Sequence, residues 1–194
     1  MFKMILIVGL GNPGKEFEKT RHNIGFEIIN EIQKELLFPS FIKKFNGVYS
    51  KKYIFNQEVI LFKPMKFMNL SGNPTQQVFN FFNIKNTDNL VVFHDDLDLE
   101  FPIIRCKTIG GHGGHNGIRD IIDIFGEKFN RIKVGIKNSF YNENNIPADK
   151  FVLAKFFDEE LNKIKLLKKK ITNNLELIIN KDFCSFKSKI KNGI

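Results

Sequence analysis

Two side chains in this sequence suit the transfer of a proton to or from water. His22 lies in the polar run TRHN (residues 20–23), and Asp95 lies in the run HDDLD (residues 94–98). Because imidazole titrates nearest to neutral pH, His22 is the best candidate for a general base. A carboxylate such as Asp95 would fix the tautomer of the ring and stabilise the imidazolium ion. We therefore predict a His22–Asp95 pair that activates a water molecule. The alternative is that His22 has only a structural role within its own loop.

Amide side chains supply the second kind of chemistry. Asn12, Asn69 and Asn116 each lie in a polar run, where they can bind amide and carbonyl groups or donate hydrogen bonds to a developing oxyanion. Ser71 lies outside the G-x-S-x-G pattern of a serine nucleophile, and neither of the two cysteines has a catalytic signature beside it. The sequence therefore favours hydrolysis by water, without a covalent intermediate.

A dinucleotide site is the first alternative. Gly9, Gly11 and Gly14 spell G-x-G-x-x-G directly after an apolar run. That fingerprint requires a helix that opens at the glycines and a second strand that ends in an acidic residue. The segment after Gly14 is polar, and the next apolar pattern has helical spacing, so we expect no nicotinamide or flavin cofactor.

A metal site is the second alternative. His94, Asp95, His112 and His115 are all ligand types, but their spacing matches no zinc pattern, and the glycines among them indicate close backbone approach. We therefore expect no metal ion and no other cofactor.

Basic residues indicate a polyanionic partner. The chain carries 30 basic and 21 acidic residues, for a net charge of +9. Lys107 precedes a glycine-rich loop, and Arg131 and Lys133 alternate on one face of a predicted strand, so the three could hold a phosphate. The alternative is an ordinary solvated strand face.

The elements that must position these residues follow from the hydrophobic pattern. Strands are expected at residues 4–8, 48–55, 59–62, 90–93, 103–107 and 129–136, and helices at 24–37, 74–82, 118–125 and 158–180. Residues 138–149 are expected to form a flexible loop. This alternation predicts an α/β fold in a single domain over residues 1–194, with a mixed twisted β-sheet flanked by helices. Polar clusters follow several strands, so we expect them to converge on one edge of the sheet.

The cellular setting is expected to be the cytoplasm. Two isolated cysteines provide neither a disulfide framework nor a zinc pattern, which favours a reducing compartment. The apolar run at residues 4–10 is short for a secretion signal and much too short for a membrane span.

Five motifs appear in the order found in one known family: GLGNPG (9–14), TRHNIG (20–25), FMNLSG (67–72), HDDLD (94–98) and GGHGGHNG (110–117). The chain resembles the bacterial-type peptidyl-tRNA hydrolases. The resemblance implies a cytoplasmic, monomeric enzyme without metal, which cleaves the ester between peptide and tRNA and so recycles tRNA from stalled or aborted translation. It implies the following roles: His22 and Asp95 catalytic; Asn12, Phe17, Phe67, Asn69, His115 and Asn116 substrate-binding; Lys107 and Lys133 binding the tRNA 5′-phosphate.

Three positions depart from the family pattern. Phe17 replaces the usual Tyr, which removes a hydroxyl, and Lys133 replaces Arg, which removes bidentate phosphate geometry. Residues 137–140 lack the usual Gly-His-Pro. The rival hypothesis is a non-catalytic RNA-binding protein on the same scaffold, like the related chloroplast splicing factors. A pure binder, however, has no physical need for a paired His and Asp beside three amides.

Overall fold

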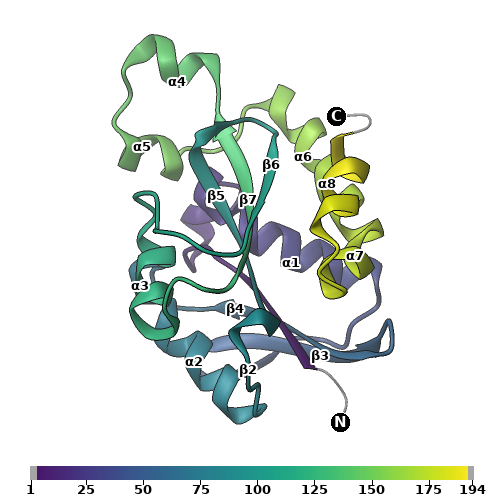
Figure 1. The fold of residues 1–194 in the computed structure, drawn as a ribbon. Helices are drawn as coiled ribbons and strands as arrows, with labels where there is room; N and C mark the ends of the chain where they lie inside the picture. Colours follow the sequence, from purple (N-terminus) through teal and green to yellow (C-terminus); the bar gives the residue numbers. More distant parts are fainter. Residues whose placement is uncertain (1–3, 192–194) are drawn as a thin grey trace.

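A seven-stranded mixed sheet forms the centre of the protein, in the order β2-β3-β4-β1-β5-β7-β6 (Figure 1). The computed structural model describes residues 4–191. The strands are β1 (Met4–Gly9), β2 (Ile42–Lys44), β3 (Gly47–Ile54), β4 (Gln57–Pro64), β5 (Leu90–Glu100), β6 (Ile104–Lys107) and β7 (Asn130–Lys137). The inner strands β4, β1, β5 and β7 are parallel, and β2, β3 and β6 join antiparallel at the two edges. The expected mixed α/β architecture is confirmed.

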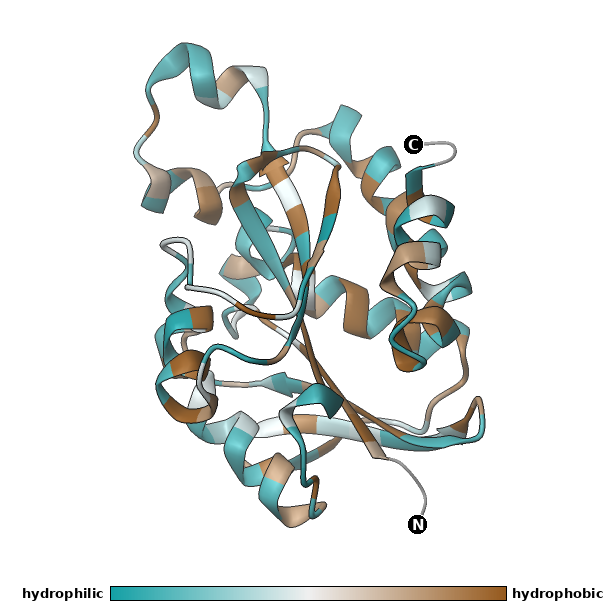
Figure 2. Ribbon diagram, viewed as in Figure 1, coloured by the Kyte–Doolittle hydropathy of each residue, from teal (hydrophilic) through white to brown (hydrophobic). Residues whose placement is uncertain are grey.

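Helices cover both faces of this sheet, so alternate residues of β1 enter different cores. Ile5 and Ile7 pack with α1 (Ile24–Glu35), α6 (Asp158–Asn173), α7 (Leu175–Ile179) and α8 (Phe183–Lys191). Leu6 and Val8 pack on the other face with α2 (Gly72–Phe81) and α3 (Asn116–Phe125). Figure 2 shows the hydrophobic residues along the crossing central strands and on helix surfaces turned toward them. Burial on two faces explains why β1 is apolar at every position rather than at every second one.

The glycines of the first loop allow α1 to approach the end of β1. A Cβ on Gly9 would lie 2.2 Å from the carbonyl oxygen of Gly25, and a Cβ on Gly25 would lie 2.4 Å from the amide nitrogen of Leu10. The backbone of Leu10 joins α1 to β5, since its carbonyl accepts from Phe26 N at 3.2 Å and its amide donates to Phe93 O at 3.0 Å. These glycines therefore serve close backbone packing.

Several expected elements differ from the structure. β5 continues through the HDDLD motif to Glu100, and the predicted helix at 158–180 is two helices, α6 and α7, separated at Asn174. The segment expected to be a loop, residues 138–149, contains α4 (Ser139–Asn144) and the start of α5 (Ala148–Leu153). Asn138 caps α4 by accepting a hydrogen bond from Tyr141 N, and Asn145 ends it in a left-handed conformation with φ of 48°. Such short capped helices carry too little periodicity to be recognised from the apolar pattern. β2 and α8 were not expected.

Within residues 4–191, no helix combines the length and apolarity needed to cross a membrane.

Candidate active site

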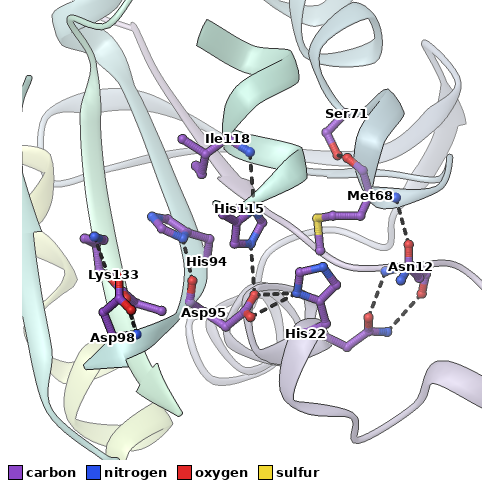
Figure 3. A network of polar contacts seen from close by, with 12 residues as sticks. Asn12, His22, Met68, Ser71, His94, Asp95, Asp98, His115, Ile118 and Lys133 are labelled. Atoms are coloured by element: carbon purple, nitrogen blue, oxygen red, sulfur yellow. Dashed lines mark hydrogen bonds and ion pairs between the residues drawn. The ribbon is translucent and has the colours of Figure 1, made fainter. Parts of the chain in front are cut away.

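His22 and Asp95 meet at the carboxyl edge of the sheet. His22 lies in a 3₁₀ turn (Arg21–Asn23) just before α1, and Asp95 lies in the second half of β5. Nδ1 of His22 is 2.8 Å from Oδ1 and 2.9 Å from Oδ2 of Asp95 (Figure 3). Since an ionised carboxylate only accepts hydrogen bonds, Nδ1 carries the proton and Nε2 is left with its lone pair. This is the arrangement that a general base requires.

His115 gives Asp95 a second imidazole partner. It is the N-cap of α3, and its Nδ1 accepts a hydrogen bond from Ile118 N at 3.3 Å. Its Nε2 therefore carries the proton and donates to Oδ1 of Asp95 at 3.0 Å. The rings of His22 and His115 lie with their centroids 4.9 Å apart. Asp95 is thus fixed from two sides, which orients the carboxylate toward His22.

The electrostatics of the pair favour ionised Asp95. Burial alone would raise the pKa of Asp95, but the charges of His22 and His115 and their hydrogen bonds hold it far below its usual range. Burial alone would lower the pKa of His22, but the charge of Asp95 and the hydrogen bond outweigh it and raise the pKa above 6.5. Burial, with His115 and Lys133 nearby, holds the pKa of His94 well below 6.5. His94 is therefore neutral, and its Nδ1 lies 2.7 Å from the backbone oxygen of Asp95.

Hydrogen bonds hold Asn12 in place but leave one of its donors, the side-chain amide nitrogen, unpaired within residues 4–191. Its backbone N–H donates to Oδ1 of Asn23 at 2.8 Å, and its carbonyl accepts from Nδ2 of Asn23 at 2.9 Å. Its Oδ1 accepts from the backbone of Met68 at 2.7 Å, which ties the loop after β1 to the loop after β4. In the described part of the chain, Nδ2 of Asn12 has no hydrogen-bond partner. Asn23, which directly follows His22, was not singled out from the sequence, although its place in the TRHN motif was a signal.

The other expected substrate-binding residues lie on separate loops and turns. Asn69 lies in the 3₁₀ turn Met68–Leu70, and Asn116 is the first residue of α3; both side chains are exposed. Phe17 and Phe67 face each other edge to face with ring centroids 6.4 Å apart, and Phe67 is 58% exposed. Of these four residues, only Asn116 lines the cavity that contains His22 and Asp95.

The guanidinium of Arg131, which the strand pattern allowed as a possible phosphate ligand, is instead bound within the protein. Its side chain is buried at 1% exposure, and its guanidinium donates to the carbonyls of Gly110, Gly111 and Glu127. Gly110 has φ of 133°, a conformation that favours glycine. Arg131 therefore fixes the glycine loop that leads to His115.

Lys107 and Lys133 differ in environment. Lys107 is exposed at the end of β6, where it pairs across the strands with Arg131, whereas Lys133 pairs with Arg105. The ammonium of Lys133 forms a largely buried ion pair with the carboxylate of Asp96, which was not expected. A phosphate bound to Lys133 would have to share its ammonium with the carboxylate of Asp96. Lys107, in contrast, has no carboxylate within 4.0 Å in residues 4–191.

A cavity of about 290 Å³ lies over the paired side chains. Its lining includes His22, Asp95, His115, Asn116 and Lys133, together with Ala148, Asp149 and Val152 from α5. Ala148 and Asp149, which were expected to lie in a flexible loop, therefore belong to a helix that forms one wall of the site.

A buried ion pair fixes that wall to the catalytic turn. Nη2 of Arg21 lies 2.5 Å from Oε2 of Glu160, and Arg21 is fully buried with its guanidinium carbon 4.5 Å from the ring centre of Phe151. The other oxygen of Glu160 accepts from Asn138 at 2.8 Å. The backbone of Arg21 also donates to Ala154 O at 3.0 Å. The signal in the sequence was the charge of Arg21 next to His22.

The residues whose possible metal-ligand atoms lie close together differ from the set that was considered from the sequence. Donor atoms of His22, Asp95 and His115 all lie within 4.8 Å of one another, so these three could hold a metal ion. His112 is outside this group, and its Nδ1 accepts from Gly114 N at 3.0 Å. The hydrogen bonds that both rings donate to Asp95 support a proton-transfer arrangement for the three. The absence of a metal remains a prediction.

Comparison with known proteins gives concordant matches. The model of the peptidyl-tRNA hydrolase family matches residues 6–193. A peptidyl-tRNA hydrolase of Clostridium botulinum (strain Eklund 17B / Type B) is 43% identical over 187 residues, 96% of this chain and 95% of the relative. One of Ehrlichia ruminantium (strain Welgevonden) is 41% identical over 189 residues, 97% of this chain and 95% of the relative. The crystal structure of peptidyl-tRNA hydrolase from Acinetobacter baumannii has a TM-score of 0.87 at 31% identity, covering 99% of this chain and 96% of that one. Each match covers nearly the whole chain.

Proposed function

The chain belongs to the peptidyl-tRNA hydrolase family, and we propose that its His22–Asp95 pair activates the water that cleaves the ester of peptidyl-tRNA. The chain is an enzyme that hydrolyses the bond between peptide and tRNA and so releases tRNA for reuse in translation. One observation carries the proposed mechanism. The hydrogen bond from His22 Nδ1 to Asp95 leaves Nε2 as the basic atom in a turn that lines the cavity.

The proposed reaction needs one group that accepts a proton from water and later donates it to the leaving ribose oxygen. His22 Nε2 takes a proton from water as the water oxygen attacks the carbonyl carbon of the ester. The ionised carboxylate of Asp95 stabilises the imidazolium that forms. As the tetrahedral intermediate collapses, the ribose oxygen leaves and takes that proton from His22. Neither Ser71, whose hydroxyl donates to Met68 O at 2.8 Å, nor a cysteine has a role in this scheme.

Amide groups around the pair would hold the reacting ester. The free Nδ2 donor of Asn12 suits a substrate carbonyl, and Asn69 and Asn116 present exposed amides from two other loops. His115 supports the site by holding Asp95. Phe17 and Phe67, which pack edge to face on each other, would offer aromatic faces to the substrate. Hydrogen bonds from preorganised amides are worth most when they reach the oxyanion rather than the ground-state carbonyl.

The tRNA would be held on the other side of the cavity. Lys107 and Lys133 lie on the antiparallel pair β6–β7, and we propose that they bind the tRNA 5′-phosphate. The net charge of +9 supports association with a polyanion. We also propose that the protein works as a cytoplasmic monomer without metal.

A non-catalytic RNA-binding role is not favoured. Such a role would leave the doubly held Asp95 and the raised pKa of His22 without a purpose. Incubation of the purified protein with N-acetylaminoacyl-tRNA tests the proposal directly. Release of free tRNA supports it, and binding of tRNA without any release would indicate the RNA-binding role.

A further inference from the structure

A second cavity, of about 310 Å³, lies beside the catalytic site. Its walls come from the loop after β1, from the first turns of α1 and from the end of β4; they include Asn12, Asn23, Phe26, Asn30 and Lys63. The two asparagines are shared with the site, since Asn12 is a proposed substrate ligand and Asn23 follows His22. The volume is at the lower end of the range of roughly 300–1,000 Å³ that is typical of ligand pockets.

Lys63 gives this cavity a cation without a carboxylate partner. Its Nζ is 2.5 Å from Oδ1 of Asn30 and lies 4.6 Å from the ring centre of Phe41 and 5.5 Å from that of Phe26. No carboxylate oxygen of residues 4–191 is within 4.0 Å of it. An ammonium is strongly hydrated and has three donors, so a neutral amide and two rings replace its water only in part.

The acidic residues that line the cavity, Glu18 and Glu27, form no ion pair with Lys63. Glu27 is turned to Lys168, whose Nζ lies 3.3 Å from its Oε2. Glu18 is exposed at the rim, as is Lys15, so these two offset each other. Burial lowers the pKa of Lys63, and the charge of Glu27 opposes this in part. An anionic group that entered the cavity would therefore find in Lys63 an ammonium that no carboxylate of residues 4–191 already pairs with.

The order of the sheet indicates which part of the substrate reaches this cavity. The proposed phosphate ligands lie on β7 and β6 at one edge, Asp95 lies on β5, and the cavity lies at the ends of β1 and β4, on the opposite side of β5. A tRNA bound at the β6–β7 edge directs the peptide away from that edge. The peptide of a tRNA bound there would extend past Asn12 toward Lys63.

We propose that this cavity binds an acidic side chain of the peptide, at the residue preceding the esterified one, with Lys63 as the specificity-determining residue. The inference rests on the proposed function, because it concerns a substrate of the same site. A carboxylate bound to Lys63 forms a charge-assisted hydrogen bond, which is about twice as strong as a neutral one. Glutamine in the same place offers a neutral amide of nearly the same shape.

The experiment compares acetyl-Glu-Ala-tRNA with acetyl-Gln-Ala-tRNA and acetyl-Lys-Ala-tRNA as substrates of the wild-type enzyme. We expect kcat/KM for the Glu peptide to exceed that for the Gln peptide by roughly three- to tenfold, with the Lys peptide slowest. Lys63→Met removes the charge while keeping the aliphatic length, so the Glu/Gln ratio should fall to about one. Lys63→Glu should reverse the order of the Glu and Lys peptides.

Lys34→Met is the matched control, because Lys34 is exposed at the far end of α1 and the change in net charge is the same. Its Glu/Gln ratio should equal that of the wild type. Circular dichroism establishes that each variant is folded. A wild-type enzyme that cleaves the Glu and Gln peptides equally well overturns the inference and leaves the esterase function intact. A wild-type enzyme that cleaves none of the peptides overturns the proposed function itself.

Discussion

The ring of His22 is joined through Nδ1 to both carboxylate oxygens of Asp95, at 2.8 and 2.9 Å. This bond decides the tautomer of His22, and it raises the pKa of the ring against the effect of burial. Two consequences for the pH dependence of hydrolysis follow, and each concerns the atom Nε2.

In the wild-type enzyme, kcat/KM should fall at acid pH as Nε2 becomes protonated. Because the pKa of His22 is raised, the midpoint of this limb should lie above 6.5. The measurement is kcat/KM for N-acetylaminoacyl-tRNA as a function of pH. A limb centred below 6.5 would contradict the proposed role of Asp95.

Asp95→Asn should move this limb toward lower pH. The variant removes the charge that raises the pKa of His22 but leaves the burial that lowers it. The plateau rate should also fall, by about 10²- to 10⁴-fold, because an amide does not enforce the same tautomer. His115→Asn is the comparison, since it removes one support of Asp95 but keeps the carboxylate charge beside His22. An unshifted limb in Asp95→Asn would mean that another group titrates.

The sequence predicts the positions of His22 and Asp95 better than it predicts the residues that hold them in place. Buried apolar runs end at Gly9 and at His94, and the carboxyl ends of parallel strands share one edge, so convergence of their polar clusters follows from strand order. The Asn12–Asn23 hydrogen bonds and the burial of Arg131 depend on contacts between segments far apart in the chain. Alternation alone places Arg131 on the same face as Lys133, but only the path of the glycine loop determines that its guanidinium is covered.

The Arg21–Glu160 ion pair should make a large contribution to the free energy of unfolding. Glu160→Gln leaves the fully buried guanidinium of Arg21 without its counter-charge, so we expect a loss of about 3–5 kcal/mol. Arg21→Met combined with Glu160→Gln should cost less than Glu160→Gln alone, because no charge is left unpaired. Urea denaturation of the two variants measures both values. A double variant less stable than the single variant would contradict this account of the pair.

Lys107 and Lys133 should both contribute to the salt dependence of tRNA binding. Replacing both by alanine should reduce the slope of log K against log salt by up to about two. Lys133→Ala alone also leaves Asp96 without its partner, so adding Asp96→Asn should restore part of the affinity. Binding is measured by fluorescence anisotropy at several salt concentrations, with Lys34→Ala as the control. An unchanged slope would place the phosphate elsewhere.

Phe17→Tyr should change activity only modestly. Phe17 is half-buried against Phe67 with ring centroids 6.4 Å apart, and a hydroxyl at its edge adds a polar group without removing the ring contact. The kinetic constants for N-acetylaminoacyl-tRNA give the comparison. Loss of all activity would mean that the rim has packed around Phe17 and has no space for the hydroxyl.

The most direct measurement is ester cleavage of N-acetylated and free aminoacyl-tRNA, in excess EDTA, by the wild type and by His22→Ala. The account predicts that the wild type cleaves the acetylated substrate at full rate with EDTA present. It also predicts that His22→Ala loses this activity while it still binds tRNA. Loss of wild-type activity on chelation would instead assign His22, Asp95 and His115 to a metal ion, and undiminished cleavage by His22→Ala would exclude His22 as the base.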